Sequence, residues 1–171
     1  MADEKHPYAS PGAITGAVNQ FRKTFPATVT ADTLRKLGIA PQNESYVINT
    51  LRYIGVIDED GNKTTKATAA FNQHDDAAFQ KAFGEMIQDA YKELFEIHGE
   101  ASWEQSFDKL IGFFRNADQT SDVVGRRQAS TFQALAALAG HGEIPATQKQ
   151  KAKEPKAKNG KLVKQAKVDS A

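Results

Sequence analysis

The order of elements between Thr30 and Thr65 constrains the fold of this chain more than any other feature of its sequence. Thr30 is a favourable N-cap for a short helix that Gly38 ends, and Asn43 is an N-cap for the next helix. That second helix has one apolar face, formed by Val47, Ile48, Leu51 and Ile54. Asp60-Gly61 is a strong hairpin signal, and the strands predicted on its two sides are Val56-Ile57 and Lys63-Thr64. Two helices joined by a short turn and followed by a hairpin are typical of a winged helix-turn-helix.

Helices are predicted on both sides of this region. Ser10 and Pro11 are typical of a helix start. The helix that they begin carries apolar residues at helical spacing, namely Ile14, Val18, Phe21 and Phe25. On the other side, Thr65 is the predicted N-cap of a short helix that ends at Phe71.

Three further helices are predicted over residues 75–140. The first and longest begins at Asp75 and ends at His98-Gly99, with an apolar stripe formed by Phe79, Phe83, Ile87, Tyr91, Leu94 and Phe95. Ser102 is the predicted N-cap of the second, whose inward residues are Trp103, Phe107, Leu110, Ile111 and Phe114. The third ends at Gly140 and carries Val124, Phe132, Leu135 and Leu138.

The composition is that of an ordinary globular protein, with 40% hydrophobic and 25% charged residues among 171. The chain has no cysteine, which excludes disulfide scaffolds, cysteine-ligated zinc and cysteine nucleophiles. No apolar run is long enough to span a membrane, and the first residues lack the apolar core of a secretory signal. We therefore expect a cytoplasmic, bacterial-type protein that does not associate with membranes.

Charge is distributed unevenly along the chain. Residues 1–75 are neutral, residues 76–148 carry a net charge of −5, and residues 149–171 carry +6. The last segment has eight lysines and few large apolar side chains, so it is predicted to be disordered. A cationic arm of this kind attracts polyanions, most often nucleic acid, although it can equally be a solubilising tail.

Two resemblances follow from these residues. The block from Ser45 to Thr64 resembles the join between recognition helix and wing in winged-helix proteins. Residues 7–140 resemble an uncharacterised bacterial and archaeal family of unknown function, through Pro7-Tyr8, the block from Ser45 to Gly61, and more loosely Phe113-Phe114 and Ala139-Gly140. The resemblance implies the fold and an association with bacterial accessory genes, and it implies no activity.

The polar face of the helix after Asn43 supplies the candidate nucleic-acid contacts. Asparagine can pair with adenine and arginine with guanine, while serine and tyrosine can reach phosphates. Lysines of the hairpin and the tail would add backbone contacts. The candidate residues are Ser45, Tyr46, Asn49, Arg52, Tyr53, Lys63, Lys66, Lys149, Lys151, Lys153, Lys156 and Lys158. Against this, the first 75 residues have no basic excess, and Asp58, Glu59 and Asp60 crowd the hairpin tip.

Other chemistry is weakly indicated. Gly125-Arg126-Arg127 could hold a phosphate near a helix start, but such a pair is more often a solvated face. No hydrolase, phosphate-loop or metalloprotease motif occurs, so we expect no enzymatic activity, no cofactor and no metal.

These observations predict a mostly helical fold in three parts. A winged helix-turn-helix spans residues 8–72, a three-helix segment over 75–140 packs on it, and a disordered Lys-rich tail covers 141–171. The leading hypothesis is a non-enzymatic, nucleic-acid-associated accessory or regulatory protein that binds DNA with little or no sequence specificity. The alternative is an adaptor module of a larger bacterial complex, with residues 75–140 docking a protein partner or a second copy.

Overall fold

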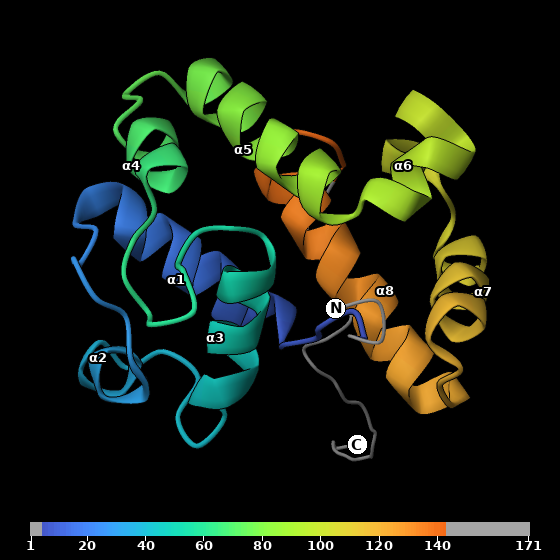
Figure 1. The fold of residues 1–171 in the computed structure, drawn as a ribbon, viewed down its shortest axis with the longest axis horizontal. Coiled ribbons are helices and arrows are strands. Elements are labelled where there is room, and N and C mark those ends of the chain that lie inside the picture. The colour runs from blue at the N-terminus through green and yellow to red at the C-terminus, as the bar shows by residue number, and fades with distance from the viewer. Residues whose placement is uncertain (1–4, 143–171) are drawn as a thin grey trace, which may run out of the picture.

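The computed structural model describes residues 5–142, and within them the fold is mostly helical, as the sequence predicts (Figure 1). In chain order the helices are α1 (Pro11–Lys23), α2 (Ala31–Lys36), α3 (Glu44–Tyr53), α4 (Thr65–Phe71), α5 (Asp76–Ala90), α6 (Lys92–His98), the 3-10 helix η1 (Gly99–Glu104), α7 (Phe107–Asp118) and α8 (Asp122–Leu138). The predicted disorder of the tail, and its lysines, lie outside the described residues.

The strands predicted around Asp60-Gly61 are reduced to two isolated antiparallel bridges in this part of the chain, Thr28–Asn62 and Ile57–Lys63. The Val29 N–H donates to the Gly61 carbonyl at 2.7 Å, so a third segment joins the hairpin. Gly61 has φ +87°, and a Cβ there would lie 2.8 Å from the Val29 carbonyl oxygen, so this turn requires glycine. The ladder stays short because α4 begins directly after Thr64.

Two predicted helix boundaries in this half are corrected. Phe25 lies outside α1, because the helix ends at Lys23, where extended backbone at Thr24 leads into Phe25-Pro26. The N-cap of α4 is Thr64 rather than Thr65, since the Thr64 hydroxyl accepts from the Ala67 N–H at 3.1 Å. The predicted N-cap of α2 is confirmed, because Thr30 and Thr33 form a reciprocal capping box.

The single helix predicted over residues 75–98 is wrong, because the chain breaks at Tyr91 into α5 and α6. At the break Tyr91 has ψ 40°, and its ring is buried against Phe132, with ring centroids 5.0 Å apart. The apolar stripe, continuous in the sequence, is therefore divided between two helices that run in different directions. This change of direction keeps both Tyr91 and Leu94 buried. The longest described helix is α8, with 17 residues.

The helix predicted to start at Ser102 starts at Phe107 instead. Ser102 is buried inside η1, where its hydroxyl donates to the Leu94 carbonyl at 3.1 Å. The actual N-cap is Ser106, whose hydroxyl accepts from the Lys109 N–H. Residues 75–140 therefore contain four α-helices and one 3-10 helix rather than three helices.

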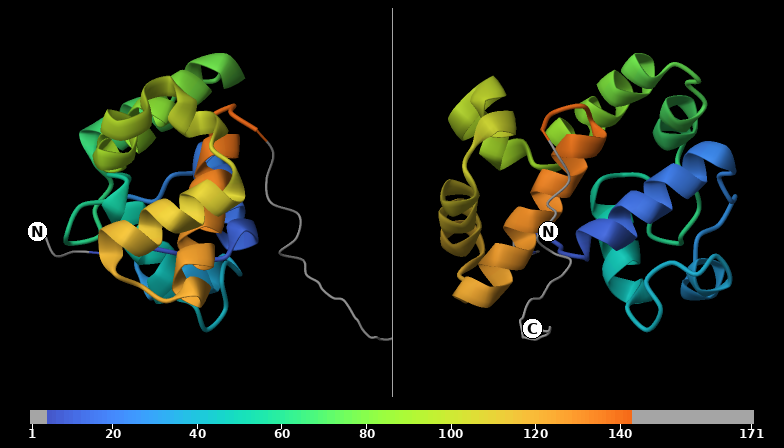
Figure 2. Two further views of the ribbon diagram at one scale, coloured as in Figure 1. Left: turned by 90° about the vertical axis from the view of Figure 1, so that its right-hand side faces the viewer. Right: turned by 180° about the vertical axis from the view of Figure 1, so that it is seen from behind.

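Helix α8 is the central element of the described chain. It contacts α1, α5 and α7, and Figure 2 shows it between α7 and α1. One continuous hydrophobic core includes Phe21 and Leu51 from the first half as well as Phe83 and Phe132 from the second. The two predicted halves thus share a core, and the entry segment before α1 runs across their junction (Figure 1).

Candidate nucleic-acid interface

Helix α3 separates its residues as its sequence pattern predicts. Val47 and Leu51 are buried in the core, whereas Ser45, Tyr46 and Asn49 are exposed on the other side. Arg52 and Tyr53, also predicted to lie on this polar side, are half-buried. Five of the candidate residues are therefore brought together on one helix face, because that face is the one α3 does not need for packing.

Arg52 is held in place by its own helix. Its Nη1 donates to Asn49 Oδ1 at 3.3 Å, and its Nε is buried without a hydrogen-bond partner among the described residues. The guanidinium is thus turned along the helix surface, and the Asn49 amide is engaged by it. Reading a base with both residues would require this pair to open.

The two tyrosines of α3 contact the entry segment, residues 5–10. Tyr46 is 43% exposed and stacks on Tyr8, with ring centroids 5.4 Å apart and an interplanar angle of 27°. Tyr53 lies edge-on to Tyr91 at 5.3 Å and packs against His6 at 5.7 Å. The entry segment therefore forms one wall of the α3 face.

A buried polar network fixes this entry segment to the second half. The His6 backbone N–H donates to Asp118 Oδ2 at 2.8 Å, and His6 Nδ1 lies 3.0 Å from both carboxylate oxygens. Gln128 Nε2 donates to the same Oδ2 and to the His6 carbonyl, both at 2.8 Å. Farther along, the Ala9 N–H donates to the Thr131 hydroxyl at 3.0 Å.

Burial also changes the chemistry of Tyr91, which stacks on His6 with ring centroids 5.6 Å apart. Its hydroxyl is buried with no hydrogen-bond partner among the described residues. Desolvation raises the pKa of Tyr91 well above its ordinary value, and the nearby Tyr53 and Asp118 raise it further. Tyr91 therefore stays neutral beneath the α3 face.

Lys63 of the hairpin and Lys66 of α4 contact partners other than the α3 face. Lys63 Nζ donates to the Phe25 carbonyl at 3.3 Å and lies 5.1 Å from the centre of the Phe25 ring. Lys66 pairs with Asp89 of α5 at 2.6 Å. The exposed hairpin tip carries Asp58, Glu59 and Asp60 instead, so its outer surface is acidic.

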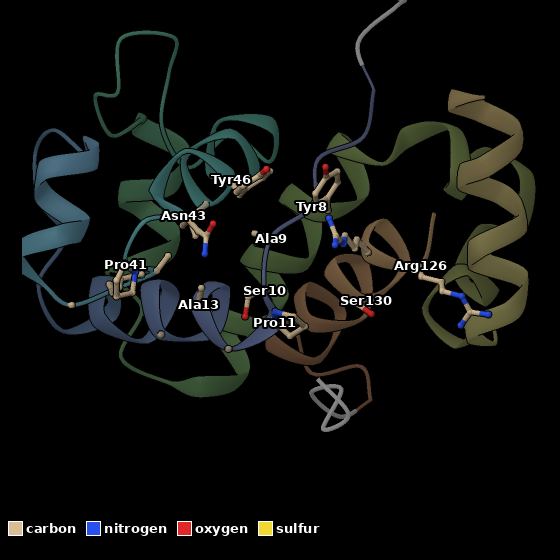
Figure 3. A pocket seen from close by; sticks show the side chains of 17 residues that line it. Tyr8, Ala9, Ser10, Pro11, Ala13, Pro41, Asn43, Tyr46, Arg126 and Ser130 are labelled. Atoms are coloured by element: carbon tan, nitrogen blue, oxygen red, sulfur yellow. The ribbon is translucent and has the colours of Figure 1, made fainter. Parts of the chain in front are cut away.

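Two arginines of α8 lie beside the entry segment. The Arg127 guanidinium lies 5.8 Å from the centre of the Tyr8 ring. Arg126 Nε donates to Asp122 at 2.7 Å, a bond that lowers the pKa of that carboxyl. Figure 3 shows Arg126 pointing away from Tyr8 and Ser10.

Two adjoining cavities open on this side of the molecule. The larger, of about 850 Å³, lies between the starts of α1 and α3 and the first turns of α8 (Figure 3). The smaller, of about 390 Å³, lies between the entry segment and α3. Of the described residues that line them, none is a carboxylate, and four are basic: Lys5, Arg52, Arg126 and Arg127. We refer to these four residues with Tyr8, Ser45, Tyr46 and Asn49 as the basic face.

The sequence indicates no binding role for Lys5 and Tyr8 of this face, and it marks the arginine pair at 126–127 only as a weak anion site. The network beneath the face has no local signal either, because His6 and Asp118 are 112 positions apart. Lys149, Lys151, Lys153, Lys156 and Lys158 lie outside the described residues, so their contribution stays a prediction.

Residues 5–142 hold no group of three or more histidine, aspartate or glutamate side chains placed to bind a metal ion. None of the helices in this range combines the length and the apolar character that crossing a membrane would require.

The model of a family of unknown function, DUF5343, matches residues 7–144 of the chain. No curated protein and no solved structure matches the chain.

Proposed function

The chain belongs to the DUF5343 family, and from this premise we propose that it is a non-enzymatic, nucleic-acid-associated accessory or regulatory protein that contacts DNA through the basic face. The observation that carries the proposal is the charge of the two described cavities beside α3. No described carboxylate lines them, and Lys5, Arg52 and Arg127 do. A carboxylate-free concave surface with several cations favours a polyanion.

The order of elements supports a winged helix-turn-helix as the scaffold of this contact. Helix α1 precedes a bridge residue, Thr28, after which α2 and α3 are joined by a short turn and followed by the bridged hairpin. In that scaffold the second helix of the pair is the one that enters the major groove, and here that helix is α3. Ser45, Tyr46 and Asn49 are its exposed residues.

The hairpin is a poor candidate for a backbone contact. Its tip is acidic, and Lys63 and Lys66 are engaged elsewhere. We therefore assign the proposed contact to α3, the entry segment and Arg127 rather than to the wing. In this arrangement the charges that face phosphate come from three separate parts of the chain.

The Lys-rich tail would add sequence-independent affinity. If six of its lysines neutralised phosphates, the slope of log affinity against log salt would be about −5. Removal of residues 149–171 is therefore expected to weaken DNA binding and to flatten its salt dependence. The body would then retain the weaker binding of the basic face.

Fluorescence anisotropy with a labelled random duplex, at low and high salt, tests the proposal on the full chain. Ser45→Glu places a carboxylate in the first turn of α3, where the helix dipole tolerates it. The matched control is Ala77→Glu, an equivalent exposed first-turn position on α5. Ser45→Glu is expected to weaken binding about tenfold or more, because like charges would then face each other.

The control is expected to change affinity less than about twofold, since distant surface charges are screened. Equal affinities for wild type and Ser45→Glu would overturn the assignment to α3. Absence of DNA binding by the full chain at low salt would overturn the function itself.

An exposed apolar side chain supports the alternative of a protein-docking module. Ile97 on α6 is 65% exposed. In the sequence it is flanked by exposed carboxylates, with Glu93 and Glu96 before it and Glu100 after it. If residues 75–140 join two copies, sedimentation of the full chain would show a dimer that Ile97→Lys dissociates. A monomer for both proteins would remove the self-association form of this alternative.

A further inference from the structure

The larger cavity of the basic face has the size of a small-molecule site. Its volume of about 850 Å³ lies within the range of ligand pockets in proteins. Its walls come from the starts of α1 and α3 and from α8, as the positions of Pro11, Asn43 and Ser130 show in Figure 3. The entry segment and the turn over residues 38–41 complete the wall.

The charge of the cavity favours an anion. Arg127 lines it, makes no ion pair with any described carboxylate, and is joined by no described acidic neighbour in the wall. The N-caps of both helices that open toward it, Ser10 and Asn43, form no side-chain cap bond, so first-turn amides of α1 and α3 lack that partner.

A polar side chain of α8 adds a contact for a ligand. Ser130 is only 9% exposed, and it lines the cavity from α8. Its hydroxyl forms no hydrogen bond with the described residues, and its oxygen is not one of their fully buried unpartnered atoms, so it keeps some contact with solvent. The hydroxyl is therefore free to donate a hydrogen bond to a ligand oxygen in the cavity.

The rim of the cavity offers aromatic surface. The stacked pair of Tyr8 and Tyr46 lies on one side of it (Figure 3), and the Arg127 guanidinium lies 5.8 Å from the centre of the Tyr8 ring. Such a platform binds flat heteroaromatic rings by stacking. Gly16 and Gly38 border the cavity with no atom within 4 Å of where a Cβ would stand, so the space is open.

We propose that this cavity binds a nucleoside monophosphate, with its base against Tyr8 and Tyr46 and its phosphate near Arg127, Ser130 and the start of α1. This small-molecule site goes beyond the proposed DNA contact, with which it shares Tyr8, Tyr46 and Arg127. Because Tyr46 belongs to α3, a bound nucleotide would contact a residue of the proposed DNA-binding helix.

Isothermal titration calorimetry on the full chain tests the proposal, with AMP, GMP, CMP and UMP as probes. Saturable binding of at least one nucleotide with one site per chain is expected. The same nucleotide is expected to bind about tenfold tighter than its nucleoside or inorganic phosphate, because each of these lacks half of the contacts.

Two variants with matched controls locate the site. A Cβ at Gly16 would meet no atom within 4 Å, so Gly16→Leu is expected to occupy part of the cavity and to weaken binding at least tenfold, whereas Gly112→Leu, equally open on α7, is not. Arg127→Gln is expected to weaken nucleotide binding about tenfold but nucleoside binding hardly at all, and Lys109→Gln is its charge control. Thermal melting confirms that each variant is folded.

Failure of all four nucleotides to bind at millimolar concentration would overturn the proposal, as would unchanged affinity in Gly16→Leu. Ser45→Glu separates this site from the DNA contact, because it is expected to reduce DNA binding while nucleotide affinity stays within about twofold. Absence of DNA binding by the unmodified full chain, with nucleotide binding intact, would reject only the DNA function.

Discussion

The basic face and the acidic face on α5, α6 and η1 differ in the interactions that hold their backbones in place. The acidic face consists of exposed carboxylates on α5, α6 and η1, namely Glu85, Asp89, Glu93, Glu96, Glu100 and Glu104. These helices pack on apolar side chains at helical spacing, such as Phe83, Ile87 and Leu94. The entry segment, which forms one wall of the basic face, is held instead by the buried polar network of His6, Asp118 and Gln128.

The two faces should therefore respond to different kinds of substitution. Apolar packing loses stability in proportion to the area removed, and charges above it can be exchanged at little cost. A buried polar network depends on every partner, because one missing group leaves others unpaired. The basic face should therefore be sensitive to single polar substitutions, whereas the acidic face should tolerate them.

The largest expected effect comes from Asp118→Ala. Its carboxylate is 5% exposed and accepts bonds from the His6 N–H and from Gln128, so its removal leaves buried donors unpaired. We expect a loss of about 3–5 kcal/mol in the free energy of unfolding, measured by urea denaturation. Asp89→Ala on the acidic face, which breaks the exposed pair with Lys66, should cost less than about 1 kcal/mol.

Similar costs for Asp118→Ala and Asp89→Ala would contradict this account of the two faces. Amide hydrogen exchange gives a second readout. In Asp118→Asn, which keeps the shape of the side chain, exchange at His6 and Ala9 should accelerate more than exchange in α6, because only the entry segment depends on the network.

A smaller effect of opposite sign is expected at Tyr91, which is buried in the shared core between α5 and α6. Its buried hydroxyl lacks a partner among the described residues, so Tyr91→Phe removes an unpaired polar group without changing the shape of the ring. We expect this variant to be more stable than wild type by about 1 kcal/mol at neutral pH. A loss of stability in thermal melts would show that the hydroxyl is paired in solution.

The same variant gives a pH test. The folded-state pKa of Tyr91 is raised by burial above the unfolded value, so the folded state holds its proton at pH values where the unfolded state has released it. Wild-type stability should therefore fall as pH rises above about 10, the unfolded pKa. The advantage of Tyr91→Phe should widen over that range and stay constant below it.

The smallest effect is expected from charge reversal on the acidic face. Glu93 and Glu96 are exposed on α6, and Glu93→Lys with Glu96→Lys should change stability by less than about 0.5 kcal/mol. DNA affinity should rise slightly at low salt because long-range repulsion is removed. Complete loss of a protein partner in this variant, with DNA affinity unchanged, would favour the adaptor alternative.

Much of the fold follows from local patterns in the chain. The caps at Thr30 and Asp75 and the stops at Gly38, Gly55 and Gly140 stand where the sequence predicts helix boundaries. The errors occur where tertiary packing overrides a periodic pattern, as at Tyr91, where one apolar stripe is divided into two helices. The shift from Ser102 to Ser106 is another case, since either serine could cap a helix and burial decided between them.

The candidate site was predicted only in part. The exposed residues of α3 follow from its amphipathic spacing, which is a property of ten neighbouring residues. The roles of Tyr8, Arg127 and Ser130 depend on the docking of the entry segment and α8 onto the first half. No periodic signal marks these residues, because each contributes a single side chain to the cavity.

The sequence by itself determined the helical character of this protein, most helix boundaries, and the division of α3 into a buried and an exposed side, since caps, glycines and apolar spacing act within a few residues. Only the tertiary fold brings His6 to Asp118 across 112 positions and places cations of three segments around two adjoining cavities. Contacts of that range leave no mark in local spacing, because they arise only when the whole core has formed.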